Sequence, residues 1–181
     1  MEKNIWQGER IRLRAVEPGD WTEFYEWHLD SEQARHSYAV PFPRSQEAQQ
    51  RWAAEEALRR PEGDIFRFVI ETREGQFAGT INTHSCDRRS GTFKYGLAVR
   101  EAHQRKGYAG EAIRLVLRYF FEELRYQKCT AHVYSFNEAS IRLHEGLGFQ
   151  LEGRLRRMVF TGGSYHDELL FGITAEEFRR S

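Results

Sequence analysis

Alternating apolar and polar residues predict a series of short β-strands along the chain. In residues 9–15, Ile11, Leu13 and Ala15 share one side and three arginines share the other. This is the pattern of a half-buried strand whose arginines face solvent. The same period of two predicts strands at 65–71, 76–84, 92–100, 128–134, 150–160 and 165–173. Short polar links join the strands within 65–100, which favours an antiparallel meander, with Gly79 at a bulge or a close approach.

Apolar residues spaced three or four apart predict helices between these strands. The clearest helix spans 111–124, and others follow Asp20, Ser45 and Asn137, which are suitable N-cap residues. A strand, a helix and a strand in succession across 92–134 imply a right-handed parallel crossover. The sequence therefore predicts a single mixed α/β (α+β) domain over residues 1–181, with a central sheet of about seven strands and flanking helices.

Composition narrows the class of protein. Lys+Arg and Asp+Glu both number 27 in 181 residues, which argues against nonspecific nucleic-acid binding. Cys86 and Cys129 lack the C-x-x-C spacing of a zinc site, so we expect reduced thiols and no metal. No apolar run approaches the roughly 18 residues of a membrane span. The polar first residues lack a signal-peptide core, so a cytoplasmic protein is expected.

The stretch 104–110, Gln-Arg-Lys-Gly-Tyr-Ala-Gly, lies between a predicted strand and the clearest helix. Small residues let a ligand approach the backbone, and free N–H groups at a helix start attract anions. Arg105 and Lys106 add two cations, so the stretch suits a pyrophosphate. It is neither a Walker A loop nor a G-x-G-x-x-G fingerprint. The alternative is an ordinary helix start with a basic, solvated face.

Two motifs carry a family resemblance. Residues 104–109 match the acyl-CoA motif [QR]-x-x-G-x-[GA], and residues 137–149 match N-x-x-[AS]-I followed by E-x-x-G-F. In this order and spacing, the chain resembles the GCN5-related N-acetyltransferase (GNAT) superfamily over nearly its whole length. Residues 151–153 and 163–167 are similar to two branches, the RimJ/RimL-type acetyltransferases of ribosomal-protein N-termini and the bacterial spermidine/spermine acetyltransferases.

The resemblance implies a sheet splayed in the middle to hold acetyl-CoA as acyl donor. The pantetheine arm would pair with the backbone of Leu97, Ala98 and Val99, and Asn137 would reach it in addition to capping a helix. An amine would attack the thioester directly, without a covalent enzyme intermediate. The residues implied for the pyrophosphate are Gln104, Arg105, Lys106, Gly107, Tyr108, Ala109 and Gly110.

The resemblance also suggests catalytic residues. His144 occupies the position of a tyrosine that protonates the leaving thiolate in many relatives, and Ser140, one turn earlier, is a rival for this role. Relatives carry a glutamate base in an E-x-G-[YW] pattern, but Lys94 replaces it here. His84 or a water chain would then act as the base. Each residue has a structural alternative: a surface histidine, a helix hydroxyl or a strand-end histidine.

The resulting hypothesis is acetyl transfer from acetyl-CoA to a primary amine: a polyamine, a protein N-terminus or a small molecule. The alternative is a noncatalytic acyl-CoA-binding or sensing domain, which the missing glutamate suggests. The acceptor is left open by the sequence, and the family favours a homodimer. Acidic residues that could attract a polyamine, or lie on a solvated helix, are Glu55, Glu56, Glu62 and Asp64. Residues that could form the acceptor pocket, or simply pack a hairpin, are Tyr165, His166 and Asp167.

Overall fold

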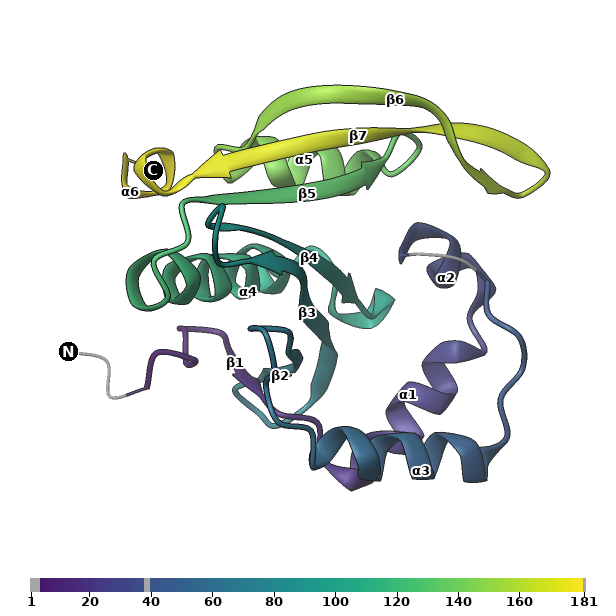
Figure 1. Ribbon diagram of the computed structural model, residues 1–181. Coiled ribbons are helices and arrows are strands. Elements are labelled where there is room, and N and C mark those ends of the chain that lie inside the picture. Colours follow the sequence, from purple (N-terminus) through teal and green to yellow (C-terminus); the bar gives the residue numbers. More distant parts are fainter. Residues whose placement is uncertain (1–3, 38–39, 181) are drawn as a thin grey trace. The chain divides into compact units, whose positions relative to one another are not determined.

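A computed structural model describes residues 4–37 and 40–180. Its elements are, in chain order (Figure 1), β1 Ile11–Arg14, η1 Pro18–Asp20, α1 Trp21–His28, α2 Ser31–Ser37, α3 Gln46–Ala57, β2 Arg67–Thr72, β3 Phe77–Asp87, β4 Thr92–Val99, η2 Glu101–His103, α4 Tyr108–Arg118, η3 Tyr119–Glu123, β5 Lys128–Tyr134, α5 Glu138–Gly146, β6 Gln150–Thr161, β7 Ser164–Thr174 and α6 Ala175–Arg180. The predicted strands are all present within a few residues of their expected bounds.

The strands form one mixed sheet in the order β1-β2-β3-β4-β5-β7-β6. β4 and β5 are parallel, as expected for strands joined through a helix, while β1–β2, β2–β3, β5–β7 and β6–β7 are antiparallel. The seven-stranded α/β fold is therefore confirmed. The register of β2 and β3 shifts beside Gly79, and a Cβ at Gly79 would lie 2.3 Å from the Ala98 carbonyl oxygen. Gly79 is thus both a bulge and a close approach, as predicted.

The described chain divides into two compact units, which are considered separately. The first comprises residues 1–82 and 97–115, and the second comprises residues 83–96 and 116–181, apart from the residues outside the described ranges. In the first unit, α1 and α3 pack together over a core of Val16, Phe24, Val69 and Phe77. Phe24 meets Trp52 of α3 and Phe77 of β3 edge to face, with ring centroids 4.7 and 5.0 Å apart. Burial of these aromatic rings supplies the main stabilisation of this unit.

The core of the second unit is also aromatic. Phe93 of β4 stacks on Phe120 at 4.1 Å and meets Tyr126 edge to face at 5.4 Å. Residues 119–123 form a π-helical turn in which the Leu124 N–H donates to the Tyr119 carbonyl at 3.2 Å. This turn ends the helix that the sequence predicted to run through residue 124. It buries both Phe120 and Phe121, whereas a regular helix would turn one of them away.

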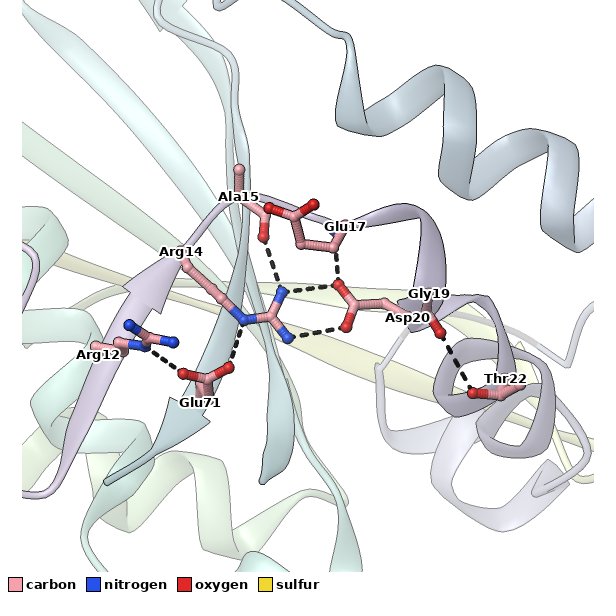
Figure 2. Close-up of polar contacts among 8 residues, drawn as sticks. All are labelled: Arg12, Arg14, Ala15, Glu17, Gly19, Asp20, Thr22 and Glu71. Atoms are coloured by element: carbon pink, nitrogen blue, oxygen red, sulfur yellow. Dashed lines mark hydrogen bonds and ion pairs between the residues drawn. The ribbon is translucent and has the colours of Figure 1, made fainter. Parts of the chain in front are cut away.

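Arg14 of β1 departs from the solvated face that the alternation predicts, whereas Arg10 and Arg12 are exposed as expected. The Arg14 guanidinium lies between two carboxylates, with Nε 2.6 Å from Glu71 and two further nitrogens each 2.8 Å from Asp20 (Figure 2). Arg12 contacts the other oxygen of Glu71. Glu71 and Asp20 expose only 8% and 10% of their side chains, so the network is largely buried. Partners on β2 and η1 therefore overturn the expectation of a solvated side chain at Arg14 alone.

Helix ends follow the sequence only in part. The Ser45 hydroxyl accepts from the Ala48 N–H at 3.1 Å, which confirms it as the N-cap of α3. Asp20 precedes α1 at the expected position, but its carboxylate accepts from Arg14 and from the Glu17 N–H instead of from the helix. The short helices α2 and α6 were not predicted, because fewer than two turns show no clear periodicity.

Candidate active site

The predicted pyrophosphate loop lies in the first unit, between η2 and the start of α4. Gln104, Arg105 and Lys106 are exposed, and Gln104 anchors the loop by donating from Nε2 to the Val99 carbonyl at 3.1 Å. Arg105 and Gly107 both have positive φ, +60° and +82°. Such alternation of backbone conformation turns successive N–H groups toward one side, which favours an anion. The geometry of the loop therefore suits a phosphate at the start of α4.

Arg10 lies against this loop, which the sequence analysis did not foresee. A Cβ on Gly107 would lie 2.3 Å from Nη1 of Arg10, so a side chain there would push the guanidinium away from the loop. The Arg10 backbone N–H donates to the Glu111 carboxylate at 3.1 Å, which fixes β1 to the first turn of α4. Arg10 thus joins Arg105 and Lys106 as a third cation at the loop. No sequence motif marks it, because it precedes the loop by almost a hundred residues.

An acidic cavity of about 390 Å³ lies beside the loop in the same unit. Carboxylates of Glu26, Asp30 and Glu101 line it, with Trp27 at its wall. Arg100, also in its lining, forms ion pairs with Glu23 and, at 3.7 Å, with Glu26, so Asp30 and Glu101 are the lining carboxylates that it does not pair with. The cavity therefore suits a cation and not a phosphate.

In the second unit, β4 and β5 pair only near their beginnings. The paired residues are Thr92 with Lys128, Phe93 with Cys129 and Lys94 with Thr130. Within the described chain, no pairing of β4 with β5 follows Lys94, although both strands continue. This early end of the pairing is the predicted splay of the sheet.

Asn137 caps α5. Its side-chain oxygen accepts from the Ser140 N–H at 3.1 Å, so the capping function is confirmed. Its contact with a cofactor stays a prediction.

His144 is not a surface residue of α5. Only 3% of it is exposed, and its ring packs between Phe149 and Phe171, with centroids 5.1 and 5.8 Å away. Nδ1 lies 2.7 Å from the Ser140 carbonyl oxygen, and Nε2 lies 2.7 Å from the Tyr95 hydroxyl. A carbonyl oxygen only accepts, so Nδ1 carries the proton and Nε2 accepts from Tyr95. Burial lowers the pKa of His144, which favours this neutral form.

His84 lies at the end of β3 with its ring already engaged. Nδ1 is 3.1 Å from the Ser85 hydroxyl, and the ring also bonds to the backbone of Tyr95. Burial, then the charges of Lys94 and His132, lower the pKa of His84. The imidazole is therefore neutral near pH 7.

Two of the three predicted acceptor residues of β7, Tyr165 and Asp167, serve the β6–β7 hairpin, whereas His166 meets Phe136 with ring centroids 4.6 Å apart. Asp167 accepts from the Arg157 N–H at 2.9 Å and from Arg154 at 2.6 Å, which holds a bulge in β6. Tyr165 lies under the Arg157 guanidinium, 4.6 Å from the ring centroid. These contacts favour the packing interpretation. Of the acidic residues near α3, Glu55 forms an ion pair with Arg51 within the helix, and Glu56 forms one with Arg59 just after it.

Comparison with known proteins decides the family. The Acetyltransferase (GNAT) domain family matches residues 10–150. The SPbeta prophage-derived uncharacterized N-acetyltransferase YokL of Bacillus subtilis (strain 168) is 47% identical over 178 residues, covering 98% of this chain and 97% of that protein. The chain belongs to the GNAT acetyltransferase family.

Two more distant N-acetyltransferases also resemble the chain, one in sequence and one in structure. The L-amino acid N-acetyltransferase AaaT of Escherichia coli (strain K12) is 23% identical and covers 87% of this chain and 93% of that protein. The spermidine N-acetyltransferase of Vibrio cholerae, solved in complex with CoA and spermine, superposes with a TM-score of 0.81 at 23% identity. That match covers 93% of this chain and 98% of the other, and it shows a common fold.

As a GNAT protein, the chain is an acyltransferase of the N-acetyltransferase type. Within the described residues, no helix has both the length and the apolar character needed to cross a membrane.

The sequence analysis did not identify Tyr95 as the buried partner of His144, although Tyr95 is next to Lys94, the residue that replaces the glutamate. The period-two alternation could have placed Tyr95 on the core side of β4, but not against His144.

Proposed function

We propose that the whole chain is one domain that transfers an acetyl group from acetyl-CoA to a primary amine by direct attack. The observation that carries this proposal is the loop 104–110. It has the family motif, two positive-φ residues, three nearby cations and the start of α4. These features support pyrophosphate binding by Gln104, Arg105, Lys106, Gly107, Tyr108, Ala109 and Gly110. Leu97, Ala98 and Val99, half-buried just before this loop, are proposed to pair with the pantetheine arm.

Direct attack needs proximity and stabilisation of the developing charge. Positioning the two substrates can contribute about 7–11 kcal/mol to lowering the barrier, and a backbone N–H of β4 would stabilise the oxyanion. His84 is the candidate base from the sequence. The acidic cavity beside the loop supports an acceptor with positive charge away from the reacting nitrogen.

The experiment combines calorimetry with acetyl-CoA and an assay of thiol release. Spermidine, an L-amino acid and a peptide with a free N-terminus are offered as acceptors. Tight binding together with amine-dependent thiol release is the expected result. Binding without turnover on any amine favours the noncatalytic alternative, and no binding of acetyl-CoA excludes both functions.

Asn137→Ser is expected to weaken coenzyme A binding without a large loss of stability. Serine also caps helices, so the N-cap of α5 is retained. The lost contact with the cofactor arm should reduce affinity about two- to tenfold, the value of one hydrogen bond. Calorimetry and thermal unfolding measure the two effects separately. A serine variant with wild-type affinity would restrict Asn137 to capping.

We propose that the Ser140 hydroxyl donates a hydrogen bond to the leaving thiolate. His144 then has a structural role, through its contact with the Ser140 carbonyl. The one proton of neutral His144 faces the Ser140 carbonyl, so the ring has none to give from Nε2. Ser140→Ala should then lower turnover about 10–100-fold, since a bond to a charged group is worth about 1.5–3 kcal/mol. Stopped assays at saturating acetyl-CoA measure this loss.

His144→Phe should act mainly on stability. The substitution leaves the buried Tyr95 hydroxyl without its hydrogen-bond acceptor, which lowers the free energy of unfolding by about 1–3 kcal/mol. The double variant Tyr95→Phe with His144→Phe removes both partners and should recover part of the loss. The opposite pattern, a 10²–10⁴-fold loss of turnover in His144→Phe alone at unchanged stability, would restore His144 as the acid.

We further propose a cytoplasmic homodimer. The family resemblance supports the dimer, and so does β6, an edge strand that exposes Leu151, Met158 and Phe160. Exposed apolar side chains on a sheet edge favour pairing with another chain. Light scattering of the purified protein measures its oligomeric state.

A further inference from the structure

A row of titratable side chains crosses one face of the sheet in the second unit. Lys94 pairs with Thr130, His132 pairs with Leu170, and Glu168 pairs with Tyr134. Successive residues of a strand face opposite sides, and directly paired residues share a side. Lys94, His132 and Glu168 therefore lie on the same face. The opposite face holds the buried residues Phe93, Tyr95, Ala131, Val133 and Leu169.

His132 and Glu168 form a close pair on this face. Nδ1 of His132 lies 3.2 Å from Oε1 of Glu168, and the two side chains are 32% and 15% exposed. This is an ion-pair contact, and a carboxylate so close to Nδ1 favours the neutral ring form that carries its proton on Nδ1. The lone pair of the neutral ring is then on Nε2. No hydrogen bond to this nitrogen is found within the described residues, so Nε2 can accept a proton from a substrate.

His84 lacks this availability. Its ring contacts the Ser85 hydroxyl and the Tyr95 backbone, and burial is the main reason for its lowered pKa. The Glu168 carboxylate lies beside His132, whereas the Lys94 ammonium is a neighbour of His84. Of the two histidines, His132 thus has the ring nitrogen that is open to a substrate proton.

We propose that His132 is the catalytic base of the acetyl transfer and that Glu168 is its positioning residue. This inference rests on the proposed function. The neutral amine nitrogen attacks the thioester carbonyl carbon, so that an N–C bond forms and the C–S bond breaks. The N–H proton passes to Nε2 of His132. The sulfur leaves with the bonding electron pair as thiolate and takes a proton from water, and His132 then releases its proton to water.

This assignment accounts for the lysine at position 94. Relatives with the E-x-G-[YW] pattern carry their base on the strand where Lys94 stands here. In this chain the carboxylate and the histidine come from β7 and β5, on the same face of the same sheet. A histidine oriented by a carboxylate is a recurrent form of general base.

The test measures turnover in His132→Ala, Glu168→Gln and His84→Ala. The substrates are acetyl-CoA and one amine. This amine is whichever the wild type acetylates fastest among spermidine, an L-amino acid and a peptide with a free N-terminus. His132→Ala should lose about 10²–10⁴-fold in kcat, the range for a general base. Glu168→Gln should lose about 10–100-fold, as for residues that orient a functional histidine. All three variants should bind acetyl-CoA with the wild-type affinity. The control is His36→Ala, which removes an exposed imidazole of α2 and should keep the wild-type turnover.

Added imidazole distinguishes a chemical from a structural loss. His132 is exposed, so imidazole can reach the space left in His132→Ala and should restore part of kcat, but it should not restore Glu168→Gln. Wild-type turnover by His132→Ala, absence of imidazole rescue, or a larger loss in His84→Ala than in His132→Ala would each overturn the assignment. An inactive wild type on every amine would instead overturn the proposed function, and the base assignment with it.

Discussion

Gly107→Asp should abolish coenzyme A binding while the rest of the protein remains folded. Gly107 has φ of +82°, a conformation that side chains rarely adopt, and any Cβ there would displace the Arg10 guanidinium. The aspartate also places a negative charge beside the proposed pyrophosphate. Together these effects should weaken binding by at least about 100-fold, since a single charged hydrogen bond contributes about 1.5–3 kcal/mol. Calorimetry with coenzyme A at fixed salt measures the loss.

Two further variants separate charge from strain. Gly107→Asn has nearly the same shape and tolerates positive φ, but it carries no charge. It should bind coenzyme A more tightly than Gly107→Asp. Gly163→Asp introduces the same residue at φ of +77° in the β6–β7 turn, where a Cβ meets no atom within 4 Å, and should bind normally. Equal, unchanged affinity in both Gly107 variants would exclude the loop as a phosphate site.

Local features of the sequence predicted most of the fold. The strands follow from alternation, and the crossover follows from a strand, a helix and a second strand in order. The N-caps Ser45 and Asn137 were also predictable, because a cap acts over three residues. The loop 104–110 could also be recognised locally, since its residues are contiguous, and its binding of pyrophosphate stays a prediction.

Contacts between distant segments were not predictable. Arg10 lies beside Gly107, and Arg14 is paired with Glu71, because the strands bring them together and not because of any spacing in the sequence. The orientation of His144 likewise depends on Tyr95 and on the two phenylalanines around the ring. For the same reason the sequence suggested His84 as the base and did not point to His132. The pairing of His132 with Glu168 depends on the register of β5 and β7.

The second large effect is expected at Arg14, in the first unit. Arg14→Met retains much of the side-chain volume but leaves Asp20 without its guanidinium partner and Glu71 with Arg12 alone. Breaking a buried ion pair on one side costs about 3–5 kcal/mol, because the remaining charge is desolvated and uncompensated. Urea unfolding at pH 7 should show a loss of this size. Arg51→Met, in the exposed pair with Glu55, is the control and should lose far less stability, because solvent screens that pair.

At acid pH, the free energies of unfolding of the wild type and Arg14→Met should differ less than at pH 7. Burial alone would raise the pKa of Glu71, but the bonds from Arg12 and Arg14 outweigh it and hold that pKa below its ordinary value. A lowered folded-state pKa contributes stability that is present above the unfolded-state pKa, about 4.3 for glutamate, and is lost as the pH falls through the folded-state pKa. The wild type should therefore lose this contribution on acidification below about pH 4, and Arg14→Met has less of it to lose. Adding Glu71→Gln to Arg14→Met removes one stranded carboxylate and should recover part of the stability at pH 7. If Arg14→Met is instead as stable as the wild type at pH 7, the network in Figure 2 contributes nothing to folding.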